Sequence, residues 1–282
     1  MASRKPLIRL QRNKRAISPA VSEVILTSAI IVLLLAAVLF ANEYLNGQVA
    51  QNEFNAMGQT MQTLGLQVDQ VAWIPGQTQT LTYTTKYGQV LLRGNTSSPA
   101  LTYSFFFNGT LVASFNVTII MFAMPTSSYG VANNYSQEVY PSSTSFLQNG
   151  TSAPVCRIFN VEQLPMPDGS FIRTVVAPIV REINALINGV TYVRFYLPIL
   201  NLGSNLQPSH SVTLTGTNVF YTTTSNVNNV TISVAFPSGA TMGLTKNFFN
   251  FNATSQTVMA GSNSNVVEIY GGNVTVSLGL YG

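Results

Sequence analysis

The most constraining feature of the sequence is an apolar run from Val24 to Ala41, eighteen residues interrupted only by Thr27 and Ser28. As an α-helix this run spans about 27 Å, close to the ~30 Å hydrocarbon thickness of a bilayer. Six of the 13 Lys and Arg residues lie within the first 16 positions, and the next basic residue is Lys86. This asymmetry predicts an N-terminus in the cytoplasm and a remainder outside the membrane.

Three interpretations compete for this segment. A conventional secretory signal has a shorter apolar stretch with a small-residue cleavage site after it, and the residues around Phe40 fit that pattern poorly. A permanent membrane anchor is physically sound. The third interpretation is a signal cut before the apolar run, which leaves the run on the mature protein.

The residues around the end of the basic stretch favour the third interpretation. Lys14-Arg15-Ala16 directly precedes Ile17-Ser18-Pro19, and Glu23 comes just before the apolar run. Over about its first 45 residues the chain resembles the archaeal type IV pilins, a family that also contains the archaellins. The resemblance implies a class III signal peptide, residues 1–16, that a membrane prepilin peptidase removes between Ala16 and Ile17.

One position departs from the related bacterial pattern. Many bacterial type IV pilins carry a glutamate at the fifth mature position, where this chain has Val21, and Glu23 follows two residues later. Glu23 either pairs with the new α-amino group of Ile17 in a neighbouring subunit, or it lies at the level of the lipid headgroups. In the second case its only role is electrostatic, because the positive end of the helix dipole stabilises a carboxylate there. Ser18 is suited to be the N-cap and Pro19 the first helical residue.

The pattern after the membrane segment predicts one long helix. No proline occurs between Pro19 and Pro75, and from Met57 the apolar residues recur at steps of four and three. We expect a helix from about Ser18 to about Trp73, on the order of 80 Å long, within a segment of residues 17–74. The residues predicted to form the core of a filament are Val24, Ile25, Leu26, Ile30, Ile31, Leu33, Leu34, Leu35, Val38, Leu39 and Phe40.

Residues 75–282 are predicted to form an extracellular, mainly antiparallel β-sandwich head, which makes the fold class α+β. Period-two runs predict two strands around a turn, over 79–84 and 87–92, and a hairpin of 101–107 with 110–122 around Asn108-Gly109. Further strands are expected over 192–197, 212–217, 229–236 and 266–276. The spacing of apolar residues predicts a short helix from Pro178 to Ile187, capped by Asn188-Gly189.

The head carries little charge. Residues 76–282 contain seven basic and five acidic side chains, so hydroxyl and amide groups must solvate its surface. The N-glycosylation pattern N-x-[ST] occurs there eight times, and this number exceeds only modestly what the composition produces by chance. The predicted acceptors are Asn95, Asn108, Asn116, Asn134, Asn149, Asn229, Asn252 and Asn273.

The sequence gives little support for nucleic-acid binding, metal binding or catalysis. After residue 17 acids outnumber bases, so no basic face remains to bind nucleic acid. One cysteine, Cys156, and one histidine, His210, leave no Cys/His metal cluster, and no motif for a cofactor occurs. We expect Cys156 to be a small buried residue and His210 an exposed bystander. We expect three acids to be solvated or paired with Arg157, Arg173 and Arg181 rather than catalytic; these acids are Glu162, Asp168 and Glu182.

We therefore expect a non-enzymatic structural subunit of an extracellular, type IV pilus-like filament for surface adhesion. It would polymerise with its own copies through the N-terminal helix after storage in the cytoplasmic membrane. The resemblance implies a prepilin peptidase, an assembly ATPase and a membrane platform protein as partners. The alternatives are an archaellin, which forms a motility filament, and a monomeric membrane-anchored surface or ligand-binding protein.

The cleavage site gives the first prediction. Protein isolated from the cell surface should begin at Ile17, because cleavage removes six cations whose burial among packed helices would cost several kcal/mol each. Replacing Ala16 with arginine should leave the full-length precursor in the membrane and abolish filaments. N-terminal sequencing checks both statements, and filaments whose subunits begin at Met1 or after Ala41 would contradict the proposed processing.

Overall fold

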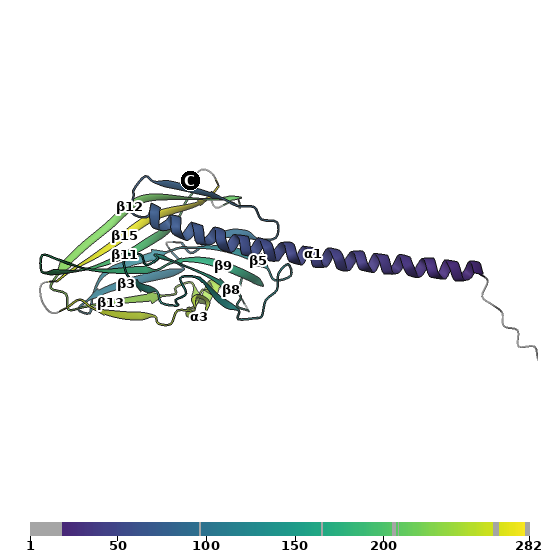
Figure 1. Cartoon of the computed structure of the whole chain (residues 1–282). Helices are drawn as coiled ribbons and strands as arrows, with labels where there is room; N and C mark the ends of the chain where they lie inside the picture. Colours follow the sequence, from purple (N-terminus) through teal and green to yellow (C-terminus); the bar gives the residue numbers. More distant parts are fainter. Residues whose placement is uncertain are drawn as a thin grey trace, which may run out of the picture. The chain divides into compact units, whose positions relative to one another are not determined.

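The computed structural model in Figure 1 describes residues 19–95, 97–164, 166–204, 207, 209–261 and 265–279. Helix α1 runs from Pro19 to Val71, and a β-rich head follows it. This arrangement confirms the predicted α+β class. The chain divides into two compact units, residues 1–48 and 49–282, and α1 contributes to both. The predicted leader, the cleavage pair Ala16 and Ile17, and Ser18 lie outside the described residues.

The described strands form three sheets. The six-stranded sheet has the order β1 (Thr78–Thr82), β12 (Ser211–Ser225), β15 (Asn265–Leu278), β11 (Val190–Leu202), β10 (Val180–Ile187) and β7 (Leu147–Asn149). The five-stranded sheet has the order β2 (Gln89–Arg93), β5 (Ile119–Pro125), β9 (Phe171–Pro178), β8 (Cys156–Val161) and β6 (Ser136–Tyr140). The four-stranded sheet has the order β14 (Ser255–Met259), β13 (Asn229–Ala235), β3 (Leu101–Phe107) and β4 (Thr110–Val117). Two short helices, α2 (Gly239–Met242) and α3 (Lys246–Phe249), lie between β13 and β14.

Pairing in these sheets is mainly antiparallel, as predicted. The parallel pairs in the described part of the chain are β11 with β15 and β7 with β10. Aromatic rings join the four-stranded and six-stranded sheets: Phe105 lies 6.0 Å from Phe195, and Phe115 lies 5.3 Å from Phe220, between ring centroids. These contacts make the head a sandwich in which alternate strand residues face a shared core.

The head half of α1 (residues 49–71) is part of that core. Its apolar residues at steps of four and three are each no more than 4% exposed; they are Ala50, Phe54, Met57, Met61, Leu64, Val68 and Val71. Phe54 packs near Phe122 of β5, with ring centroids 6.3 Å apart. Gly65 lets β8 approach closely, since a Cβ there would meet Ile158 Cδ1 at 2.9 Å. The predicted helical stripe is therefore core packing.

Glycines also allow the end of the helix to meet the six-stranded sheet. A Cβ on Gly216 of β12 would lie 2.4 Å from the carbonyl oxygen of Val71. A Cβ on Gly272 of β15 would lie 2.4 Å from the carbonyl oxygen of Ala72. Because real Cβ atoms do not approach backbone oxygen this closely, glycine is required at both positions.

The Asn-Gly signals mark two-residue hairpin turns. Asn108 and Gly109 have φ of 48° and 83°, and Phe107 pairs with Thr110, as predicted. The second Asn-Gly pair, Asn188-Gly189, does not cap a helix. Residues 180–187 form strand β10, so the predicted helix from Pro178 to Ile187 is wrong. Asn188 and Gly189 have φ of 51° and 79° and join β10 to β11, with Ile187 opposite Val190.

The physical reason for the error is that tertiary pairing decides this segment. β10 is paired along its length with β11, and three of its residues pair with β7. Leu186, which the helical spacing assigned to a buried face, is 74% exposed. The β-branched residues of this segment are suited to a pleated strand, and apolar spacing over eight residues does not separate the two structures.

Two other predicted strand regions differ in detail. The strands expected around a turn at 79–92 are present as β1 and β2, but β1 pairs with β12 and β2 pairs with β5, in different sheets. The long run expected over 110–122 divides at Thr118, whose backbone N–H donates to the carbonyl of Leu200. β4 and β5 therefore belong to different sheets.

The buried stripe of α1 gives the second prediction. Leu64→Ala should destabilise the head by about 2–5 kcal/mol, because it removes a fully buried side chain from a packed core. Leu66→Ala is the matched control, since Leu66 is 50% exposed on the same helix and its loss should cost less than about 1 kcal/mol. Urea unfolding of the full chain in detergent measures both, and equal effects would show that the helix is not core.

Candidate assembly segment

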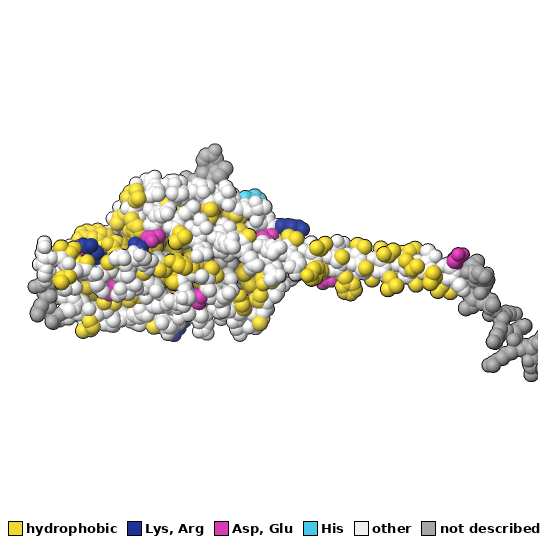
Figure 2. Space-filling model, viewed as in Figure 1, with side chains coloured by type: hydrophobic (Ala, Val, Ile, Leu, Met, Phe, Trp, Pro, Cys, Tyr) yellow, Lys and Arg dark blue, Asp and Glu magenta, His cyan; other side chains and the backbone are white. Residues whose placement is uncertain are grey.

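The N-terminal half of α1 (residues 21–45) presents apolar side chains that its own chain leaves uncovered. Figure 2 shows hydrophobic side chains along this segment. All eleven residues predicted for a filament core are exposed, from 48% at Ile30 to 73% at Phe40. They include the consecutive Leu33, Leu34 and Leu35, each at least 60% exposed. Because consecutive residues of a helix point about 100° apart, apolar groups occupy every side of it.

Two polar side chains interrupt the apolar run, and both donate hydrogen bonds to the helix backbone. Thr27 Oγ1 donates to the carbonyl of Glu23, and Ser28 Oγ donates to that of Val24, both at 2.7 Å. The most apolar 18-residue window has a mean hydropathy of 3.0, and by length and composition the helix is able to cross a membrane. Pro19 is the first described residue and lies in the helix, and the side chain of Glu23 is exposed.

A carboxylate that the sequence analysis did not single out anchors the start of the head half of α1. Glu53 accepts hydrogen bonds from the backbone N–H groups of Lys86, Tyr87 and Gly88, at 2.8–3.2 Å. Hydrogen bonds from N–H groups to a carboxylate are stronger than those between neutral groups, and Glu53 accepts from three such donors. The loop that joins β1 to β2 is thereby fixed to the helix.

A second carboxylate anchors the other end of the head half. Asp69 accepts from Trp73 Nε1 at 2.8 Å and pairs with Arg181 of β10 at 3.0 Å. The Arg181 guanidinium lies 5.3 Å from the ring of Tyr196, which Trp73 contacts edge-on. A signal existed in the sequence: Glu53 and Asp69 are the acids of a helical segment that otherwise carries neutral polar residues.

Two arginines are buried completely in the head. Arg157 binds Glu138 in a two-pronged ion pair, donates to the carbonyl of Phe249 and stacks 4.7 Å from the ring of Phe159. Arg173 pairs with Asp168 at 2.6 Å, and its burial lowers the pKa of the guanidinium.

We expected Glu162, Asp168 and Glu182 to be solvated or paired with Arg157, Arg173 and Arg181. One of these pairs forms among the described residues, Arg173 with Asp168. Arg157 and Arg181 instead pair with Glu138 and Asp69, and Asn184 Nδ2 donates to Glu182 at 2.7 Å. Glu162 is 3% exposed, and its Oε2 atom has no hydrogen-bond partner. For Arg157 and Arg181, the acid that forms the ion pair is therefore not the acid nearest in the sequence.

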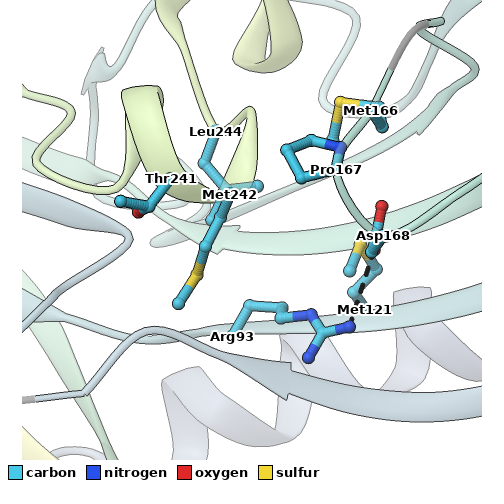
Figure 3. Close-up of a pocket in the computed structure, with 8 residues that line it drawn as sticks. All are labelled: Arg93, Met121, Met166, Pro167, Asp168, Thr241, Met242 and Leu244. Atoms are coloured by element: carbon cyan, nitrogen blue, oxygen red, sulfur yellow. Dashed lines mark ion pairs between the residues drawn. The ribbon is translucent and has the colours of Figure 1, made fainter.

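A small pocket of about 190 Å³ is lined by Asp168, the partner of Arg173, and by Arg93 (Figure 3). Arg93 reaches from β2 to Asp168 at 3.5 Å, and Met121 and Met242 contribute to the walls. Ligand pockets are typically about 300–1,000 Å³, so this one is small for an organic cofactor. Asp168 is shared by two guanidinium groups, which makes the carboxylate a structural link between β2 and β9.

The predicted glycan acceptors differ in exposure. Six have exposed side chains: Asn95, Asn108, Asn116, Asn134, Asn149 and Asn252. Asn229 and Asn273 are half-buried, and Asn273 Oδ1 accepts from Asn201 Nδ2 at 3.2 Å.

The single histidine and the single cysteine have the predicted exposure and burial. His210 is exposed. Cys156 is 2% exposed, and burial raises the pKa of its thiol, so it is a poor nucleophile.

Comparisons with known proteins add no relative to this picture: no protein-family model, curated protein or solved structure matches the chain. The fold itself is a long N-terminal apolar helix followed by a β-rich domain, a layout compatible with a pilin.

The buried Tyr83 and the half-buried Tyr270 give the third prediction. Burial raises the pKa of Tyr83 and of Tyr270 to about 12, from an ordinary value near 10. Their contribution to stability is therefore complete below about pH 10 and is lost as pH rises through about 12, because the unfolded chain releases these protons first. The urea midpoint of the full chain in detergent should fall over that interval.

Tyr83→Phe is the control for this titration. It removes the hydroxyl that donates to the carbonyl of Ser209, which should cost about 1 kcal/mol at neutral pH and reduce the alkaline decline. A midpoint that stays constant up to about pH 12 would contradict the assignment.

Proposed function

We propose that the chain is a structural subunit of an extracellular, type IV pilus-like filament that polymerises through the N-terminal half of α1 and serves in surface adhesion. The observation that carries this proposal is the apolar helix whose every side is exposed in its own chain. A helix that is hydrophobic all round is stable only in lipid or within a bundle. Many copies of the same helix supply such a bundle.

The energetics support storage in a membrane before assembly. Moving the eleven exposed apolar side chains into water costs on the order of 20 kcal/mol, so spontaneous release from lipid does not occur at a useful rate. An assembly ATPase and a membrane platform protein would provide the work of extraction. The prepilin peptidase would first remove the six leader cations, which a bundle cannot accommodate.

The head half of α1 supports the same proposal. It is the continuation of the apolar helix and also a core element of the head, anchored by Glu53 and Asp69. A chain built in this way carries a folded domain on each helix of a bundle. In the proposed filament the heads form the outer surface, with Ser, Thr and Asn rather than charged groups facing the surroundings.

The fourth prediction places a charge in the proposed core. Leu34→Lys should abolish filaments on the cell surface while the chain still reaches the membrane, because a cation in packed hydrocarbon costs about 3 kcal/mol or more per copy. Leu34→Met keeps the site apolar and should assemble normally. Electron microscopy of sheared surface material, with the head detected by antibody in membranes, measures both variants.

The outcomes separate the alternatives. Filaments of normal number from Leu34→Lys would contradict a core position for this helix. Absence of filaments from the unaltered protein, with the chain present in membranes, would indicate a monomeric anchored surface protein. Loss of swimming together with loss of filaments would indicate an archaellin.

A further inference from the structure

Six strands lie at the open ends of the three sheets in the described part of the head: β1, β2, β4, β6, β7 and β14. An open edge presents unpaired N–H and C=O groups that pair readily with a strand from another molecule. Proteins usually protect such edges with charged side chains or proline. These six strands contain only two charged residues, Arg93 and Glu138, and both are engaged in ion pairs, with Asp168 and Arg157.

The exposed glycosylation patterns coincide with these edges. Asn116 lies within β4, and Asn149 is the last residue of β7. Asn95 follows β2 by two residues, and Asn134 precedes β6 by two. The two remaining exposed acceptors are Asn252, three residues before β14, and Asn108, in the turn that leads into β4. Five of the six edges thus carry at least one exposed acceptor.

The other two acceptors lie on interior strands. Asn229 is in β13, between β14 and β3, and Asn273 is in β15, between β12 and β11. Both side chains are half-buried. An acceptor asparagine must present its amide nitrogen to a transferase, and a half-buried interior position is poorly placed for that.

We propose that the six exposed acceptors carry N-linked oligosaccharides, that these glycans shield the sheet edges from pairing with neighbouring heads, and that Asn229 and Asn273 stay unmodified. In the transfer, asparagine Nδ2 forms a C–N bond to the anomeric carbon of a lipid-phosphate-linked oligosaccharide. The C–O bond between that carbon and the phosphate breaks, and the phosphate leaves with the electron pair and takes up the amide proton. The proposal rests on the extracellular location of the head in the proposed function.

Edge pairing depends on how closely two strands can approach and on how concentrated the heads are. A strand that adds to an edge must approach to about 4.8 Å, and a bulky hydrated glycan beside the edge prevents that approach. Subunits held in a filament keep their heads at high effective concentration, about millimolar for short tethers, so unprotected edges would meet continually. Glycans supply here the protection that charged residues supply in other β proteins.

The fifth prediction concerns occupancy. Mass spectrometry of glycopeptides from the native chain, taken both from membranes and from surface material, should show glycan on the six exposed acceptors and none on Asn229 or Asn273. Glycan on the two interior acceptors, or bare asparagine at the edges, overturns the proposal. Because the membrane-bound chain is sampled as well, this result does not depend on filament assembly, which Leu34→Lys tests separately.

A matched pair of triple variants tests the shielding. Ser97→Ala, Thr151→Ala and Thr254→Ala remove exposed hydroxyls and abolish the patterns at Asn95, Asn149 and Asn252, one edge in each sheet, without changing an asparagine. The control is Thr223→Ala, Thr224→Ala and Ser225→Ala, three exposed residues outside any pattern, in the part of β12 that pairs with β15 and extends beyond β1.

Both variants are purified from the native host in detergent, which covers the apolar helix, and followed by size-exclusion chromatography with light scattering. The edge variant should lose its monodisperse peak over time to larger, β-rich species, while the control keeps it. Circular dichroism at the start establishes that both heads are folded. Equal persistence of the two peaks overturns the shielding role.

Discussion

The structure depends on one constraint: a helix whose first half is apolar on every side has no covering surface in its own chain. The two hydroxyl side chains within its apolar run, Thr27 and Ser28, donate to carbonyl groups of the helix itself. What the helix needs is an apolar environment around Leu33, Leu34 and Leu35, and lipid and a bundle of identical helices both provide one. The membrane-stored and filament states of the proposal are two solutions to the same requirement.

The second half of the same helix solves its burial problem within the chain. Its stripe from Ala50 to Val71 fills the sandwich core, and Glu53 and Asp69 fix it with charge-assisted hydrogen bonds at either end. The head uses charge sparingly and places it inside: Arg157 and Arg173 are fully buried, each against a carboxylate and an aromatic ring. Few charged residues remain on the exterior, and in our proposal the sheet edges are therefore protected in another way.

Sequence reasoning succeeded where the signal is local. The apolar run, the four–three stripe and the Asn108-Gly109 turn each depend on neighbouring residues, and the helix and the hairpin are present as predicted. It failed where partners are distant. The segment 178–187 carries a helical spacing, but its pairing with β11 decides its structure. The anchors Glu53 and Asp69 find their partners 33–35 and 112 residues away, and no local pattern encodes such pairs. The candidate assembly segment was visible in the sequence because the property that defines it, uniform apolarity, is local as well.

Electron cryo-microscopy of filaments sheared from the cell surface tests the central claim most directly. The account predicts a bundle of helices at the filament axis whose density accommodates Ile17 to about Leu45 of this chain, with β-sandwich heads on the outside. Filaments built from another subunit, or a core in which residues 24–40 of this chain face solvent, would contradict it.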